Sequence, residues 1–583
     1  MTIFSPQLTD GEDPPRQISV SFHSRDDKSE VQLTQTRLCL NDYPEMQEKW
    51  VGASGIPVEW SFNYLKYLEV EGCDFLTNAV LPSHLLPLLS NLEELTVKKC
   101  KRVAAIFDVK DTPPEHDDPN KIVTIPVREI FLKELPTLTH VWNNDTKASL
   151  SFPSLEKVFV EECKSIKSLF PASVPRDNLQ LLVVRNCGGL EEIVAKDEAF
   201  PQEVIILFPK LTCLVLRDLP KLRCTCSGMQ SLLDWSAVLT RLYVSRCPML
   251  KVFAQDIQNS NPGVEDCFAT DDDKHHLVSS AQKVTTSNFE ELELSKEDVT
   301  MIEKGLLHVD LQNLNYLGLN NFNDDETDEF PDVFLSKMSL PKLKEFQLLD
   351  CAFKYIFRPK RPDMDYSKML SQLNYLEITN LHKLNSMGFE HPWMAPLLES
   401  LETLKVSECN LLTNLAASSV VSFLYLRVLR VENCAGLKYL FTSSTAKSLG
   451  ALRELVITKC KSLETVVAHE EGETPDDLIL FSNLYTLSLN ELPQLESFYT
   501  GNSTLYFSSI YYVSFTVTKC NKMKTFSHGD VLPKFLQGEI DEDPWHGDLN
   551  NAVRSSFKKQ AVSHNKDDMY VHIYEVCVVL KLE

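Results

Sequence analysis

Cysteine is the reactive side chain that this sequence uses most systematically. Ten of the 16 cysteines end a nine-residue phrase with three apolar anchors. Because the chain begins without a secretory signal, we expect reduced, structural thiols that donate to backbone carbonyls. Thiols on successive strands would lie about one strand spacing apart, so disulfide pairing stays geometrically open as the alternative. The ladder consists of Cys73, Cys100, Cys163, Cys187, Cys247, Cys351, Cys409, Cys434, Cys460 and Cys520.

The other groups of potential metal ligands lack the spacing of known metal-binding motifs. Cys224 and Cys226 form a lone C-x-C without a second half, and His275 and His276 lie beside Asp271–Asp273 in a polar stretch. A metal site needs convergent ligands on a fixed frame, so a solvated loop is the simpler interpretation. The acidic runs at 324–329 and 539–543 lack the glycine of a calcium-binding loop. We expect no metal and no cofactor.

Motifs of catalysis are missing as well. The sequence has no phosphate-binding or dinucleotide-binding glycine loop, no H-E-x-x-H and no G-x-S-x-G. Its 14 histidines are scattered without the spacing of a triad or of an acid–base pair. We therefore expect a binding protein and not an enzyme.

Composition narrows the class of partner. Of 583 residues, 43% are hydrophobic and 24% are charged, as in a folded soluble protein. Asp and Glu outnumber Lys and Arg by 82 to 58, which gives a net charge of −24. Phosphate backbones need clustered positive charge, so we expect no nucleic-acid partner. No stretch approaches the roughly 20 apolar residues of a membrane span, so we expect no membrane contact and a location in the cytosol or the nucleus.

The nine-residue phrase recurs throughout the chain. It reads apolar, two variable, apolar, one variable, apolar, two variable, and then Cys or another apolar residue. Most copies start 24 to 35 residues after the previous copy, with one gap of 50. Fixed internal spacing at a regular period indicates a stacked repeat array. The 16 copies begin at residues 65, 92, 127, 155, 179, 211, 239, 289, 314, 343, 373, 401, 426, 452, 484 and 512.

The phrase has the alternation of a β-strand, and one such strand cannot bury its apolar side alone. Stacked copies would form a continuous core under a parallel sheet. We therefore predict an α/β repeat solenoid, with a parallel β-sheet on the concave face and short irregular or helical segments on the convex face.

We place the domain boundaries of the chain where the nine-residue phrase no longer occurs. The expected parts are an N-terminal cap or degenerate repeats over 1–60, repeats over 61–247, a mobile acidic insertion over 248–288, repeats over 289–530, and a C-terminal cap or tail over 531–583.

The repeats resemble a known group. The phrases FPSLEKVFVEECKSIKSLFP (152–171), LQLLVVRNCGGLEEIVAKDE (179–198) and LRVLRVENCAGLKYLFTSS (426–444) look like the leucine-rich-repeat region of plant coiled-coil nucleotide-binding (NLR) disease-resistance proteins. The resemblance covers roughly 60–530, and no residue here matches the nucleotide-binding module of those receptors. It implies a protein-recognition role in plant immunity, toward a pathogen effector, a guarded host protein or the receptor's own switch domain. The alternative is a leucine-rich-repeat substrate adaptor of a ubiquitin ligase, although 1–60 does not supply the helical F-box.

One stretch of the concave face offers candidate binding residues. Positions three, five and seven of each phrase should point away from the core. Between residues 127 and 247 they form an aromatic and aliphatic stripe flanked by cations, which favours an acidic, partly apolar protein partner. Packing of the same residues on an insertion or a neighbouring domain is the alternative. The candidates are Phe131, Lys133, Phe159, Arg185, Arg217, Arg241 and Tyr243.

Overall fold

A computed structural model describes residues 37–40 and most of 65–558, with larger gaps at 109–121, 196–207, 224–237, 251–288, 324–333 and 357–366. Cys224, Cys226, His275, His276 and most of the expected N-terminal cap and acidic insertion lie outside the described residues. The chain divides into an N-terminal unit (Met1–Leu239 and Arg246–Val264) and a C-terminal unit (Thr240–Ser245 and Glu265–Glu583).

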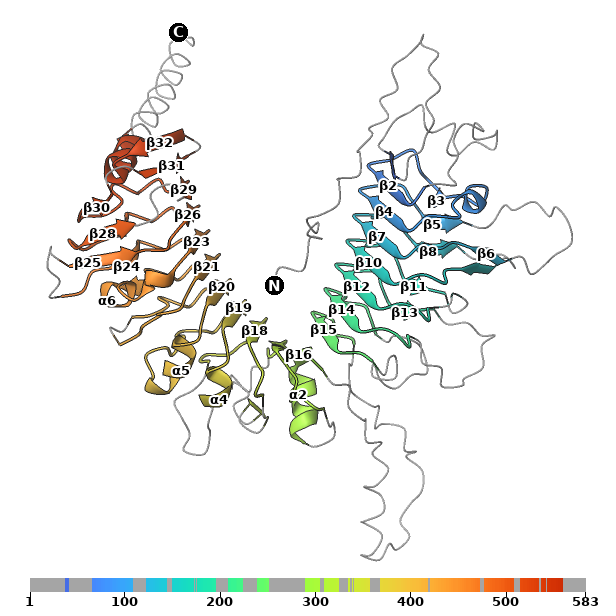
Figure 1. The fold of residues 1–583 in the computed structure, drawn as a ribbon, viewed down its shortest axis with the longest axis horizontal. Helices are drawn as coiled ribbons and strands as arrows, with labels where there is room; N and C mark the ends of the chain where they lie inside the picture. Colours follow the sequence, from blue (N-terminus) through green and yellow to red (C-terminus); the bar gives the residue numbers. More distant parts are fainter. Residues whose placement is uncertain are drawn as a thin grey trace, which may run out of the picture. The chain divides into compact units, whose positions relative to one another are not determined.

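Each unit is built on a ladder of parallel strands in register, one strand from each repeat (Figure 1). The alternation of the phrase explains the ladder, because positions four and six face the core and positions three, five and seven face the opposite side, here called the ladder face. In the N-terminal unit the ladder strands are β1 (Arg37–Leu40), β2 (Tyr67–Glu71), β4 (Glu94–Lys98), β7 (Glu129–Lys133), β10 (Lys157–Glu161), β12 (Leu181–Arg185) and β14 (Cys213–Arg217).

The C-terminal unit continues the same pattern over more repeats and ends in an antiparallel strand, β32 (Asp543–Gly547). An antiparallel partner followed by helical residues 549–558 closes the open edge of the ladder. The parallel strands are β15 (Arg241–Ser245), β16 (Glu291–Ser295), β17 (Tyr316–Asn320), β18 (Glu345–Leu349), β19 (Tyr375–Thr379), β20 (Thr403–Ser407), β21 (Val428–Glu432), β23 (Glu454–Thr458), β26 (Thr486–Asn490), β29 (Ser514–Thr518) and β31 (Leu536–Ile540).

The return segments carry short parallel strands of their own. Those of the N-terminal unit are β3 (Ala79–Leu81), β5 (Ala105–Asp108), β8 (His140–Asn143), β6 (Ile122–Thr124), β9 (Ser149–Ser151), β11 (Ser168–Phe170) and β13 (Glu192–Val194). Those of the C-terminal unit are β22 (Phe441–Thr442), β24 (Thr465–Ala468), β27 (Ser497–Tyr499), β25 (Leu478–Phe481), β28 (Thr504–Phe507) and β30 (Val531–Leu532).

Helices in the return segments are short. They are η2 (Leu86–Leu88), α2 (Lys296–Glu303), α4 (Ser367–Leu370), η5 (Pro392–Met394), α5 (Ala395–Leu398), α6 (Ser443–Ala446) and η6 (Leu449–Ala451). The predicted solenoid, with a parallel sheet and short irregular or helical returns, is therefore confirmed.

Aromatic rings stack on one another within the largely aliphatic core under the sheets. In the N-terminal unit the rings of Trp142 and Phe170 stack with centroids 4.9 Å apart. In the C-terminal unit Phe498 and Phe526 stack at 4.7 Å, and Phe481 and Phe507 stack at 5.3 Å. Aromatic contacts between successive repeats join the stack into a continuous core.

The chain turns sharply at position eight of the phrase, directly after each ladder strand. Fourteen non-glycine residues there have φ between 53° and 59°, and Gly72 has φ 65°. This left-handed conformation turns the chain away from the strand, so that the residue at position nine enters the core. The backbone N–H of Lys459 still donates to the Asn490 carbonyl at 3.0 Å, which extends the ladder by one hydrogen bond.

Substitution at Lys459 tests the turn. Left-handed backbone costs an L-residue about 1 kcal/mol and costs glycine almost nothing. We expect Lys459→Gly to raise the free energy of unfolding by up to about 1 kcal/mol, and Lys459→Val to lower it, because a β-branched side chain is worse still in this region. Urea denaturation of both variants measures the difference; equal stabilities would contradict the assigned turn.

The repeat beginning at residue 289 replaces this turn with α2. Ser295 caps the helix, and its side chain accepts from the Asp298 backbone N–H at 3.3 Å. In return the Asp298 carboxylate accepts from the Ser295 N–H at 2.9 Å and from its hydroxyl at 2.7 Å. Burial raises the pKa of Asp298 to about 6, although the bonds from Ser295 act to lower it.

This raised pKa predicts a pH-dependent stability. Since the folded state holds the proton more tightly than the unfolded chain, whose carboxyl pKa is 3.8, the stabilisation is complete below pH 3.8 and is lost as the pH rises through about 6. The loss should be on the order of 2–3 kcal/mol relative to Asp298→Asn. Thermal melts of both proteins at pH 4 and pH 7 measure it. A stability difference that is the same at both pH values would argue against the assignment.

Candidate protein-binding surface

Two phenylalanines face outward on adjacent strands of the N-terminal unit. Phe131 on β7 and Phe159 on β10 occupy the same register position, and their half-buried rings lie 5.9 Å apart. The ammonium group of Lys98 lies 5.6 Å from the centroid of the Phe131 ring. Aromatic rings fixed on a rigid sheet are frequent anchors for a protein partner.

The lysines beside these rings are balanced by carboxylates on neighbouring strands. Lys133 Nζ lies 3.1 Å from Glu161, and Lys98 Nζ lies 3.1 Å from Glu69. Exposed pairs of this kind contribute little stability, about 0–1 kcal/mol, but they cancel charge. The predicted cationic flank is therefore neutral around Lys133, because in-register pairing brings Glu161 beside it.

The two candidate arginines lie on the next two strands of the ladder, β12 and β14, where no aromatic side chain faces outward. Arg185 on β12 and Arg217 on β14 are in register and half-buried at position seven. The strands β12 and β14 contain no acidic residue. Their position-five residues, Val183 and Val215, are buried. The strands β12 and β14 thus carry two arginines and no carboxylate of their own, and Glu161 of β10 is in register beside Arg185.

The last two candidates belong to the C-terminal unit. Arg241 is exposed at the start of β15. Tyr243 is on the ladder face, as its position in the phrase indicates, but the expectation that a partner can contact it is wrong, since it is only 3% exposed and its ring packs 5.5 Å from that of Tyr316. Five of the seven candidates are therefore on the N-terminal unit, and Tyr243 has a packing role.

Sequence reasoning missed a polar network on the C-terminal ladder face. The Tyr316 hydroxyl donates to Glu293 at 3.1 Å and also contacts Gln347. A side chain at Gly318 would collide with this arrangement, since a Cβ there would lie 2.7 Å from Glu293 Cγ. The pattern Tyr-x-Gly within a ladder strand is the signal that could have revealed it.

All ten ladder cysteines are buried and carry free thiols. Cys434 Sγ donates to the Glu432 carbonyl at 3.4 Å, and Cys520 Sγ donates to the Thr518 carbonyl at 3.4 Å. Burial raises the pKa of Cys351 and of Cys520 to about 12. The thiols of Cys351 and Cys520 are therefore protonated near neutral pH, which suits packing and disfavours nucleophilic chemistry.

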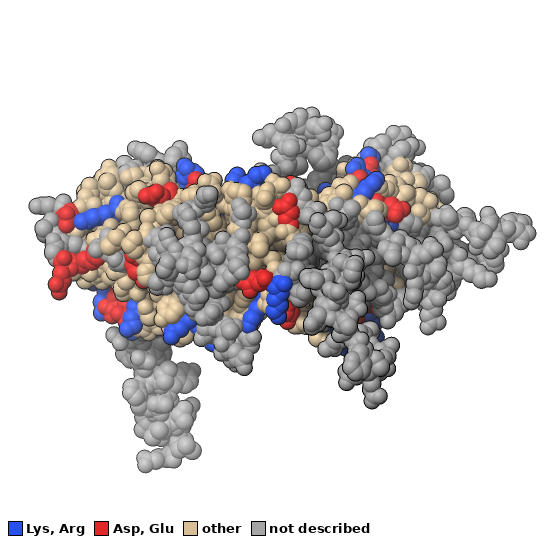
Figure 2. Space-filling view, turned by 90° about the horizontal axis from the view of Figure 1, so that it is seen from below, with Lys and Arg blue, Asp and Glu red and all other residues tan. Residues whose placement is uncertain are grey.

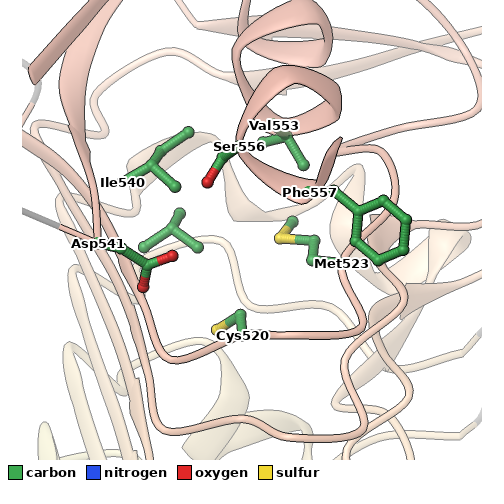
Figure 3. A pocket seen from close by; sticks show the side chains of 8 residues that line it. Cys520, Met523, Ile540, Asp541, Val553, Ser556 and Phe557 are labelled. Atoms are coloured by element: carbon green, nitrogen blue, oxygen red, sulfur yellow. The ribbon is translucent and has the colours of Figure 1, made fainter. Parts of the chain in front are cut away.

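A small hollow beneath helical residues 549–558 is lined mostly by apolar side chains, with Met523 and Phe557 on one side and Ile540 on the other (Figure 3). No group of three or more His, Cys, Asp or Glu side chains within the described part of the chain could hold a metal ion. On the face shown in Figure 2, basic and acidic residues are interspersed. None of the helices in the described ranges is long and apolar enough to cross a membrane.

Parallel strands in register, one from each repeat, with an apolar core beneath them define the protein as a leucine-rich-repeat solenoid. Residues 33–181 and 417–529 match the family model described as plant disease resistance protein RPS2-like, leucine-rich repeats. These two segments of the chain are therefore similar to the leucine-rich repeats of plant disease-resistance proteins.

Relatives in Arabidopsis thaliana support this assignment. A putative disease resistance protein is 28% identical over 163 residues, which are 28% of this chain and 12% of the relative. A probable disease resistance protein is 32% identical over 127 residues, or 21% of this chain and 17% of the relative. The chain thus spans only a small part of these relatives. Among solved structures, a TLR13–ssRNA13 complex aligns with 80% of this chain and 63% of that chain, at 14% identity and a TM-score of 0.35.

Proposed function

We propose that the chain is a non-catalytic protein-recognition module of intracellular plant immunity, which senses an effector or regulates defence signalling. The observation that carries the proposal is the pair Phe131 and Phe159, held half-exposed on adjacent strands. Repeats of the plant disease-resistance type support the setting in defence.

The partner contacts the ladder face from β7 to β14. An apolar group of the partner covers Phe131 and Phe159, where the neighbouring lysines are already neutralised. An acidic group of the partner meets Arg185 and Arg217, which are half-buried and in register on adjacent strands. Charge complementarity of this kind adds specificity and a faster association rate to the apolar contact.

Two variants separate these contributions. Phe159→Ala removes an aromatic anchor, and Arg185→Glu with Arg217→Glu reverses the charge. The matched control is Lys101→Glu with Arg102→Glu, two exposed residues in the turn after β4. Circular dichroism melts establish that each variant folds before binding is compared.

Each tagged protein is purified from leaf tissue challenged with a pathogen, and the proteins that bind are quantified by mass spectrometry. We expect at least one partner to be reduced roughly tenfold or more in both test variants and to be retained by the control. Retention of every partner by both folded test variants would overturn the proposal.

A further inference from the structure

A second surface lies at the edge of the C-terminal unit, beside the starts of β21, β23 and β26, which follow one another in the stack (Figure 1). It comprises Leu424, Tyr425, Gly450, Arg453, Leu480 and Tyr485, here called the edge patch. These residues belong to the three consecutive segments that precede β21, β23 and β26, with Gly450 in η6 and Leu480 in β25.

Backbone hydrogen bonds hold the three repeats together at this edge. The Arg453 N–H donates to the Arg427 carbonyl at 2.8 Å, and the Tyr485 N–H donates to the Arg453 carbonyl at 2.9 Å. Asn483 Nδ2 donates to the Gly450 carbonyl at 2.8 Å. These bonds place Arg453, Tyr485 and Gly450 on neighbouring repeats of a fixed frame.

The edge patch exposes unusually large apolar side chains. Leu424 and Tyr425 are each 55% exposed, Leu480 is 39% exposed and Tyr485 is 45% exposed. Single exposed apolar residues are ordinary, but a cluster of them marks an interaction surface. Tyrosine is also among the residues that most often dominate binding energy.

Glycine leaves open space in the middle of the edge patch. A Cβ built at Gly450 would meet nothing within 4 Å. Gly450 lies in η6, in the repeat between those of Tyr425 and Tyr485. An apolar side chain from a partner can enter the space above Gly450 and contact the neighbouring repeats on both sides.

The edge patch also contains a positive charge, that of Arg453. The other cations near this edge are engaged, since Arg427 lies 3.0 Å from Glu402 and Lys447 lies 3.5 Å from Asp477. Arg453 is exposed and, within the described part of the chain, forms no ion pair. An arginine available beside exposed tyrosines is complementary to a carboxylate on a partner.

We propose that the edge patch binds a protein segment in which a large apolar residue lies close to an Asp or Glu. The apolar side chain lies over Gly450 between Tyr425 and Tyr485, and the carboxylate pairs with Arg453. This contact is separate from the ladder face of the N-terminal unit, so it does not depend on the proposed function.

The probe is a phage-displayed library of random 12-residue peptides, selected on the purified full chain. We expect enrichment of peptides that carry Leu, Phe or Trp within a few residues of Asp or Glu. The best peptide is then synthesised, labelled and titrated by fluorescence polarisation against wild type and four variants.

Arg453→Glu and Gly450→Leu should each weaken binding of the peptide roughly tenfold or more, by repulsion of the carboxylate and by filling the open space. Arg102→Glu is the matched charge control, and Tyr355→Ser is a control at a tyrosine that is 43% exposed elsewhere in the same unit. Both controls should bind as wild type does. All substituted side chains are on the surface, so thermal melts should change little.

Three results would overturn the proposal. One is selection of peptides without an acidic residue, and another is binding that Arg453→Glu and Gly450→Leu leave unchanged. The third is light scattering that shows a dimer of the wild-type chain which Gly450→Leu dissociates, because the edge patch would then be occupied by a second copy.

Discussion

Phe498→Ala is expected to lower the free energy of unfolding of the C-terminal unit by about 3–5 kcal/mol. Phe498 is fully buried, stacks on Phe526 at 4.7 Å and meets the edge of the Phe481 ring at 5.9 Å. Its removal leaves a cavity that the neighbouring repeats cannot close, since the backbone of each repeat is fixed by the ladder on both sides.

Urea denaturation followed by circular dichroism measures this loss. Leu411→Ala is the control, because Leu411 is 53% exposed in the same unit and its truncation should cost less than about 0.5 kcal/mol. Similar costs for the two substitutions would show that Phe498 does not pack as described.

Cys434→Asp should be equally damaging, with a loss of about 3–5 kcal/mol at neutral pH, because it places an uncompensated charge in the core. Cys434 is fully buried, and its thiol donates to the carbonyls of Glu432 at 3.4 Å and Val406 at 3.8 Å. A carboxylate offers only acceptors to those carbonyls, whereas the hydroxyl of Cys434→Ser can still donate.

The same measurement at two pH values tests the cause. A buried aspartic acid gains a donor when it is protonated, so the defect of Cys434→Asp should shrink as the pH falls toward 4. We expect Cys434→Ser to lose much less, with no such pH dependence. A stable Cys434→Asp protein at pH 7 would contradict a buried, packing role for the cysteines that end the phrase.

The ladder could be predicted because its cause is local. Alternating apolar residues in the phrase define each strand, and identical spacing in successive copies sets the register, as for β20 and β21. The turn at position eight was not predicted. Gly72, Asn186 and Asn433 at that position signal left-handed backbone, but Lys and Glu in other copies hide the pattern.

The binding surface was less predictable, because exposure and pairing depend on what neighbouring strands bring. Phe131 and Phe159 face outward as their positions in the phrase indicate. Lys133 is neutralised by Glu161, and Tyr243 is covered by Tyr316, which comes from a strand two places along the ladder. Neither contact follows from the phrase that contains the predicted residue.

The central claim is that the ladder face around Phe159 touches a protein partner, and photo-crosslinking tests it most directly. A benzoylphenylalanine is incorporated at position 159, or at position 102 as a control, and the chain is expressed in challenged leaf tissue. We expect a discrete crosslinked protein at position 159 that is absent at position 102 and is lost when Arg185 and Arg217 are replaced by Glu. Crosslinks that are the same at both positions, or none at position 159 in a folded protein, would contradict it.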